Sequence, residues 1–156
     1  DDLVGVQLGG AIKNVYAIGS GIVKGLNYGE NAGAAILTRA ISEMVRISVS
    51  LGGKKESIFG LSGVGDILLT CNSEMSRNFT LGKAIGQGNN LKEIINNKNT
   101  IAEGYFTTKA IYNSVKSKNV EAPILNSIYD ILYKNANPKD EAKSLLKRPL
   151  KNKEFY

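Results

Sequence analysis

The chain has 156 residues, a net charge of +6, 42% hydrophobic and 22% charged residues, which is typical of one soluble globular domain. It contains one cysteine, Cys71, and no histidine. These counts exclude an intrachain disulfide, a Cys/His zinc site and any nucleophile activated by a histidine base, and no metal site is expected. A general base must therefore be Lys, Asp, Glu or Tyr. The single cysteine fits a reducing cytoplasm, and no apolar run is long enough to span a membrane.

The first predicted element is a helix from Leu3 to about Leu26, because apolar residues recur at steps of three and four. The members of this stripe are Val4, Leu8, Ala11, Val15, Ile18 and Ile22. Small and polar residues lie on the opposite face, namely Val6, Gly9, Gly10, Lys13, Ala17, Ser20 and Lys24. A face of small side chains allows close approach of another domain or a ligand, so we expect this face to be free of the domain's own core.

A second helix is predicted from an N-cap at Asn31 to about Leu51, where Gly52 and Gly53 end it. A glycine-rich bend at 60–65 precedes the largely apolar run 66–71, and a polar loop leads to a short helix that starts at Ser76 and runs towards Ile85. Cys71 is expected to be a small buried hydrophobe.

The remaining predicted elements are also helices. They cover 91–96, 103–118, 123–135 and 138–147, with Pro123 in a first turn and Asn137-Pro138 as a cap. No strand, repeat or low-complexity linker is apparent. The sequence therefore predicts an all-α domain with several buried helices, followed by a basic tail.

Lys13 lies opposite the apolar stripe and among glycines. It is either a solvated surface lysine or a lysine held in a partly desolvated cleft, where it could act as a general acid or base. Asp66 follows the glycine-rich bend, so it is either a helix N-cap or a carboxylate that orients a lysine or a substrate hydroxyl. If 66–71 is helical, Asp66 and Thr70 share one face.

The segment Ser76-Arg77-Asn78 begins a helix, whose free backbone N–H groups and positive dipole end suit an anion. Arg77 adds a forked donor that suits a phosphate, and Ser76 and Asn78 add polar side chains. Capping plus a solvated arginine explains the same residues. Gly63-Val64-Gly65 lacks the third glycine and the preceding strand of a dinucleotide-binding fingerprint, so no nucleotide-binding domain is recognisable in this chain.

Four stretches resemble the C-terminal domain of bacterial NAD(P)-dependent glycerol-3-phosphate dehydrogenases. They are VGVQLGGAIKNVYAI, NAGAAILTRAISEM, GLSGVGDILLTCNSEMSRNFTLG and IAEGYFTTKAIY, in the order and spacing of that family. The resemblance covers nearly all of residues 1–150 and is most specific in the GVGDILLTC…SRN block. It implies a multi-helix fold like the C-terminal domain of 6-phosphogluconate dehydrogenases, without the N-terminal Rossmann domain. Residues 1–150 would form the helical substrate-binding domain and 151–156 the basic tail.

The resemblance also implies an activity and a set of site residues. The family interconverts dihydroxyacetone phosphate and sn-glycerol 3-phosphate with NAD(P)H, for phospholipid biosynthesis. Lys13 matches its general acid/base. The positions that match its substrate-binding residues are Lys13, Asp66, Ser76, Arg77 and Asn78. The cofactor, NAD or NADP, would be bound mainly by the missing N-terminal domain, with contacts here from Arg77, Ile101 and Glu103. Asn14 and Thr70 are further residues that could line the site.

Two alternatives to an enzyme domain are open at this stage. One is a basic helical module that binds nucleic acid, which rests on the charge of +6 alone; the lysines are scattered among acids, so we expect no nucleic-acid partner. The other is a non-catalytic dimerisation domain, and a homodimer is also compatible with the enzyme hypothesis.

Overall fold

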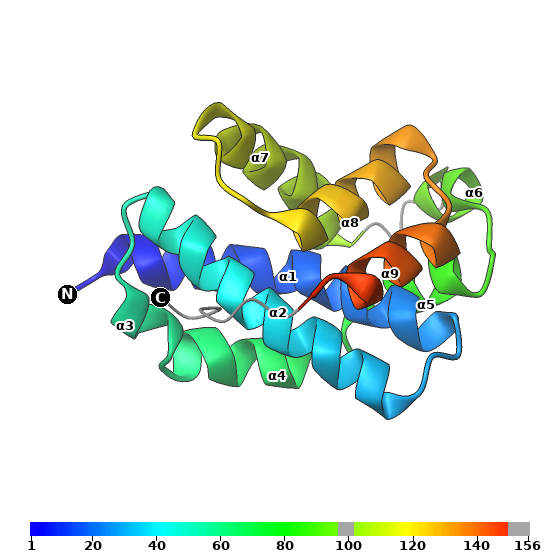
Figure 1. Cartoon of the computed structure of the whole chain (residues 1–156), viewed down its shortest axis with the longest axis horizontal. Helices are drawn as coiled ribbons and strands as arrows, with labels where there is room; N and C mark the ends of the chain where they lie inside the picture. The colour runs from blue at the N-terminus through cyan, green and yellow to red at the C-terminus, as the bar shows by residue number, and fades with distance from the viewer. Residues whose placement is uncertain (97–101, 150–156) are drawn as a thin grey trace.

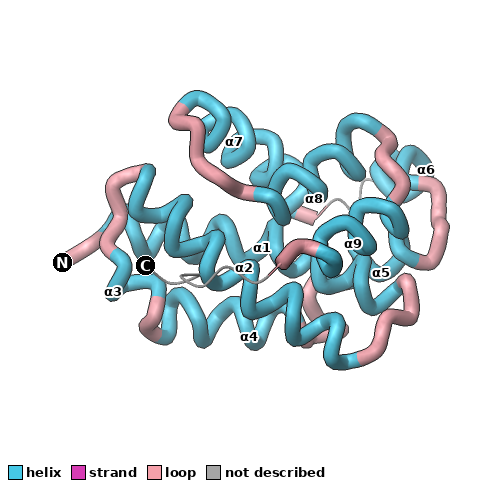
Figure 2. The backbone as a smooth tube through the Cα atoms, viewed as in Figure 1, coloured by secondary structure: helices cyan, strands magenta, loops and turns pink. Residues whose placement is uncertain are grey.

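The computed structural model describes residues 1–96 and 102–149, and all regular structure within these ranges is helical (Figures 1 and 2). The elements are α1 (Leu3–Gly25), α2 (Glu30–Ser50), α3 (Lys55–Ile58), a π-helical turn η1 (Leu61–Gly65), α4 (Asp66–Cys71), α5 (Arg77–Gly86), α6 (Leu91–Asn96), α7 (Glu103–Ser117), α8 (Pro123–Lys134) and α9 (Pro138–Lys147). The predicted all-α fold is confirmed. No helix in the described ranges is long and apolar enough to cross a membrane.

Helix α1 is the central element, and the other long helices pack around it (Figure 1). The predicted apolar stripe is confirmed in its second half, where Val15, Ile18 and Ile22 are buried, whereas Val4 is exposed. The expectation of a free small-residue face is wrong at Gly9 and Ala17, which are buried within the domain. At Gly9 the covering element is η1, because the carbonyl of Ser62 and the Cα of Gly63 lie against it. Of the two glycines on this face, Gly9 and Gly10, only Gly10 has open space where a Cβ would lie.

Helices α1 and α5 are in direct backbone contact. Cβ atoms at Gly21 and Gly25 would collide with the backbone of α5, and Cβ atoms at Gly82 and Gly86 would collide with the backbone of α1. Four glycines therefore bring two helix backbones into direct contact. The helices run in the same direction, since Gly82 lies against Ile18 and Gly86 lies against residues one turn further along α1.

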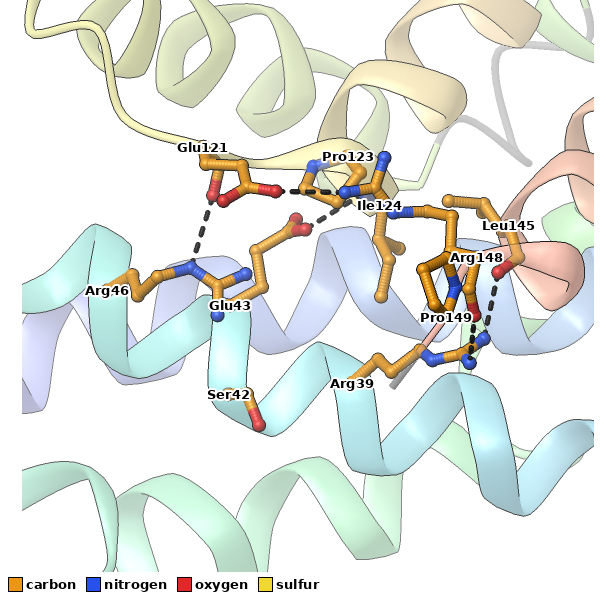
Figure 3. Close-up of a pocket in the computed structure, with 10 residues that line it drawn as sticks. All are labelled: Arg39, Ser42, Glu43, Arg46, Glu121, Pro123, Ile124, Leu145, Arg148 and Pro149. Carbon is orange, nitrogen blue, oxygen red and sulfur yellow. Dashed lines mark hydrogen bonds and ion pairs between the residues drawn. The ribbon is translucent and has the colours of Figure 1, made fainter. Parts of the chain in front are cut away.

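Two side chains of helix α2 form hydrogen bonds with the ends of two other helices (Figure 3). The buried carboxylate of Glu43 accepts hydrogen bonds from the backbone N–H groups of Ile124 (2.9 Å) and Leu125 (2.8 Å) in the first turn of α8. The guanidinium of Arg39 donates to the carbonyls of Leu145 and Arg148 at the end of α9. An acid thus meets a helix N-terminus and a base meets a helix C-terminus, which are the favourable dipole arrangements.

Most of the predicted helix ends are confirmed. Asn137 caps α9 with its side chain, and Asn135 ends α8 in the left-handed conformation, at φ 55°. Asn31 as an N-cap is wrong, because α2 begins at Glu30 and its N-cap is Gly29, two residues before Asn31; Gly29 has no side chain that could accept a hydrogen bond. The four-residue helix α3 was not predicted, since it is too short to show a period. The polar connection at 97–100 and the tail 151–156 lie outside the described residues.

The glycine contact predicts a sharp dependence of stability on one methyl group. Gly82→Ala places a Cβ against the backbone of Ile18, which cannot rotate away, so we expect a loss of about 1–3 kcal/mol in the free energy of unfolding. Gly33→Ala in α2 is the matched control, because its Cβ meets nothing within 4 Å; it should gain about 0.5–1 kcal/mol. Urea unfolding measures both, and equal effects would contradict backbone contact at Gly82.

Glu43 predicts a pH dependence of stability. Burial raises the pKa of this carboxyl from 4.5 to about 7, although its hydrogen bonds with Ile124, Leu125 and Tyr16 oppose the rise. A pKa raised by folding means that the folded state binds the proton more tightly. The contribution of this proton to the free energy of unfolding is fully present below about pH 4.5 and is lost as the pH rises through 7.

Glu43→Gln removes this titration. Relative to the variant, the wild-type chain should therefore lose about 2–3 kcal/mol of unfolding free energy between pH 5 and pH 8. Denaturant unfolding of both proteins across that range provides the measurement. Parallel pH profiles would show that Glu43 stays ionised throughout.

Candidate functional site

The centre of the candidate site is an ion pair between α1 and α4. The Lys13 Nζ lies 2.7 Å from a carboxylate oxygen of Asp66, and the two side chains are 24% and 40% exposed. The lysine is thus half-sheltered rather than a freely solvated surface residue. The carboxylate of Asp66 holds the ammonium group of Lys13 in one place.

The turn η1 carries Asp66 to this position. Gly63 packs directly on the backbone of Ile58, and the carbonyl of Ser62 lies 2.9 Å from where a Cβ of Gly9 would be. Glycines at these two positions let the turn lie flat on α1. The helix α4 then begins at Asp66, and no side chain caps its N-terminus. The N-cap interpretation of Asp66 is therefore wrong, because its carboxylate crosses to Lys13.

Thr70 lies one turn after Asp66, as the helical spacing predicts. Its hydroxyl donates to the Asp66 carbonyl at 2.7 Å. This bond leaves the hydroxyl oxygen as an acceptor on the face of α4 that also carries Asp66.

A second group of polar residues joins α1, α5 and α7. The side-chain amide of Asn78, which is 8% exposed, donates to the Asn14 side-chain oxygen at 3.0 Å. Its own oxygen accepts the backbone N–H of Gly104 at 2.8 Å. A Cβ on Gly104 would lie 2.6 Å from that oxygen and 2.7 Å from the Asn14 carbonyl. Asn78 therefore caps α7 from outside and fixes the start of α7 against α1.

Ser76 and Arg77 stand at the start of α5. Ser76 is the N-cap, and its hydroxyl oxygen accepts the Phe79 N–H at 3.3 Å, which confirms the capping role. Arg77 is exposed, and its guanidinium makes no hydrogen bond or ion pair within the described part of the chain. Its five N–H donors are available to an anion at a positive helix end.

The structure brings most of the predicted residues into two adjoining groups. Lys13, Asp66 and Thr70 form the first group. Arg77 and Asn78 belong to the second. The two groups are linked by the hydrogen bond between Asn14, which follows Lys13 in the chain, and Asn78, which follows Arg77. Glu103 is exposed at the first position of α7. Ile101 lies outside the described residues.

Gly104 was missed by the sequence analysis. A glycine at the second position of a helix, next to the predicted Glu103, was the available signal. An arrangement of this kind offers a lysine as proton donor or acceptor, a carboxylate that orients it, and an arginine with free donors for an anion.

Comparison with known proteins supplies the family. Residues 2–143 match the family model described as NAD-dependent glycerol-3-phosphate dehydrogenase C-terminus. The chain belongs to this family. It is similar to glycerol-3-phosphate dehydrogenase [NAD(P)+] of Staphylococcus aureus, with 45% identity over 152 residues, which are 97% of this chain and 46% of the relative. The resemblance drawn from the sequence motifs is thus confirmed.

Solved structures agree with this assignment. The crystal structure of glycerol-3-phosphate dehydrogenase from Coxiella burnetii superposes with a TM-score of 0.91 and 38% identity, and it matches 95% of this chain and 46% of its own. The Plasmodium falciparum glycerol-3-phosphate dehydrogenase shares the fold, with a TM-score of 0.80 at 23% identity. The chain spans about half the length of the relatives it matches.

Proposed function

We propose that this domain binds the phosphorylated substrate and supplies the general acid/base of an enzyme that interconverts dihydroxyacetone phosphate and sn-glycerol 3-phosphate. The observation that carries the proposal is the half-sheltered Lys13–Asp66 pair in a domain of this family. Family membership favours this function over a nucleic-acid-binding module or a purely structural dimerisation domain.

Lys13 would move the proton at the substrate's second carbon. In the direction of reduction, the ammonium Nζ donates a proton to the oxygen that becomes the hydroxyl of glycerol 3-phosphate. In the direction of oxidation, the neutral amine takes that proton back. Asp66 holds the Nζ at 2.7 Å and thereby orients it towards the substrate oxygen. Proton transfer of this kind contributes about 10²–10⁴-fold to the rate.

Arg77 would bind the phosphate end of the substrate. Its guanidinium has no partner in the described residues, and it follows the N-cap of α5, where the helix dipole also favours an anion. Ser76 and Asn78 hold this helix start in position through their own bonds and could add polar contacts to the substrate. Asn14 and Thr70 would line the space between the phosphate and Lys13.

This domain would contact the cofactor from one side only. Bound NAD or NADP would exchange a hydride with the substrate's second carbon. Two residues of this domain could face the cofactor: Arg77, whose guanidinium has no partner among the described residues, and Glu103 at the exposed start of α7. Ile101 is the further predicted contact. A homodimer and a cytoplasmic location are further parts of the proposal.

The first test of this function is an activity measurement. We would replace the matching C-terminal half of the Staphylococcus aureus relative by this chain and follow NADH and NADPH oxidation with dihydroxyacetone phosphate. Lys13→Ala should lower kcat by about 10²–10⁴-fold while thermal unfolding stays nearly unchanged, because the lysine acts on the proton. Lys143→Ala, an exposed lysine in α9, is the control and should leave kcat unchanged. Near-normal turnover of Lys13→Ala in an active, folded chimera would overturn the assigned role.

Arg77 predicts a different kinetic change in the same chimera. Arg77→Ala should raise the KM for dihydroxyacetone phosphate by about 10–100-fold, since it removes charge-assisted hydrogen bonds to the phosphate. Added phosphate or guanidinium ions offer a direct check: guanidinium should restore part of the lost activity, and inorganic phosphate should inhibit the variant less than the wild type. An unchanged KM would assign the phosphate to other residues.

A further inference from the structure

Three hydrogen bonds form a continuous chain from α7 through α5 to α1. The backbone N–H of Gly104 donates to the Asn78 side-chain oxygen at 2.8 Å, and the Asn78 amide donates to the Asn14 side-chain oxygen at 3.0 Å. The Asn14 amide in turn donates to the carbonyl of Gly10 at 3.4 Å. We call this chain of donors and acceptors, from Gly104 to Gly10, the amide relay.

The two backbone ends of the amide relay determine its direction. A backbone N–H can only donate and a carbonyl can only accept, whereas a side-chain amide has an oxygen on one side and an NH₂ on the other. The Gly104 N–H therefore requires the oxygen of Asn78, which leaves the NH₂ of Asn78 for Asn14. In the same way, the NH₂ of Asn14 is left for the Gly10 carbonyl. Asn78 is 8% exposed, so a reversed amide that set donor against donor would be costly.

This direction leaves donors on the relay and not acceptors. Each NH₂ group has a second N–H, and neither second N–H has an acceptor within residues 1–96 and 102–149. The two amides directly follow Lys13 and Arg77 in the chain, which are themselves donors. N–H groups suit the oxygen atoms of a phosphorylated substrate, whereas amide oxygens would repel them.

Glycine at position 104 is required by the relay. A Cβ there would lie 2.6 Å from the side-chain oxygen of Asn78 and 2.7 Å from the carbonyl oxygen of Asn14. Any other side chain would therefore push against both residues that carry the relay amides. A glycine inside a helix is less favourable than an alanine, and Gly104 is the second residue of α7. Close approach to the two amides is the physical reason for a glycine here.

We propose that Gly104 is a positioning residue for the substrate. Its N–H fixes the direction of the Asn78 and Asn14 amides, so that each amide keeps an N–H for the oxygen atoms of the phosphorylated substrate. Gly104 acts through these two amides and does not itself touch the substrate. The inference rests on the proposed function and adds a residue of α7 to it.

Gly104→Ala in the Staphylococcus aureus chimera tests the inference. The methyl group displaces the relay amides, so the KM for dihydroxyacetone phosphate should rise by about tenfold, and kcat should fall by less. Gly33→Ala is the matched control, because its Cβ meets nothing within 4 Å, and it should leave the KM unchanged. In a folded Gly104→Ala chimera, an unchanged KM or a loss confined to kcat would overturn the inference.

A double-mutant cycle separates positioning from an independent structural effect. Because Gly104 acts through the amides, Gly104→Ala should change the KM for dihydroxyacetone phosphate by less than about twofold in the Asn78→Ala background. Additive effects of the two substitutions would show that Gly104 acts by another route, and would overturn the inference.

Asn78→Asp provides a second test that does not depend on the folding of Gly104→Ala. The carboxylate still accepts the Gly104 N–H and so keeps α7 capped, but it can no longer donate. We expect thermal unfolding close to that of the wild type and a KM for dihydroxyacetone phosphate raised by at least about tenfold. An unchanged KM would overturn the inference. An inactive wild-type chimera would contradict the proposed function and this inference with it, whereas an active wild type with unaffected variants would contradict this inference alone.

Discussion

The direct backbone contact between α1 and α5 is the constraint on which the rest of the site depends. Helices ordinarily pack 8–10 Å apart, and only residues without a Cβ allow a closer approach. Glycines at Gly21, Gly25, Gly82 and Gly86 give this approach from both sides, so the two helices interlock at one offset. Residues that lie at the same level on the two helices are 64 positions apart in the chain, as the Asn78–Asn14 hydrogen bond shows. The same interlocking therefore fixes Arg77 at the level of Lys13.

The other helices are held by polar bonds between a side chain of one helix and the end of another. Asn78 caps α7, Glu43 caps α8 and Arg39 binds the last carbonyls of α9. Helix ends have unpaired backbone groups, and burial makes an unpaired group costly. Since none of α2, α7 and α8 has a side-chain cap of its own, these long-range partners determine where α7 and α8 begin. Three of the four arginines lie in the cluster around Glu43 and have structural partners. Arg77 is the one arginine without a hydrogen-bond or ion-pair partner among residues 1–96 and 102–149.

The helices could be predicted from the sequence because their signals are local. Periodicity, Pro123 and Asn137 mark where helices run and begin, and none of these depends on distant contacts. The small-residue face of α1 was assigned wrongly at Gly9 and Ala17 for a physical reason: a small residue permits close approach but does not indicate whose atoms approach. The same limit applies to Asp66, since a carboxylate after glycines fits a local cap as well as a lysine 53 residues away. Only the packing of η1 on α1 decides between them.

The segment 72–76 connects α4 to α5. At its far end, Ser76 caps α5 and Arg77 is the first residue of that helix. At its near end, Asn72 follows the last residue of α4. The bond of the Asn72 amide to the Leu68 carbonyl and the ion pair of Glu74 with Lys83 attach the segment to α4 and α5. Both attachments are exposed and individually weak, so the segment can adjust without disturbing the glycine contact beneath it. The glycine contact thus positions both Lys13 on α1 and Arg77 on α5, the two residues proposed to meet the substrate, and the segment before α5 can adapt around them.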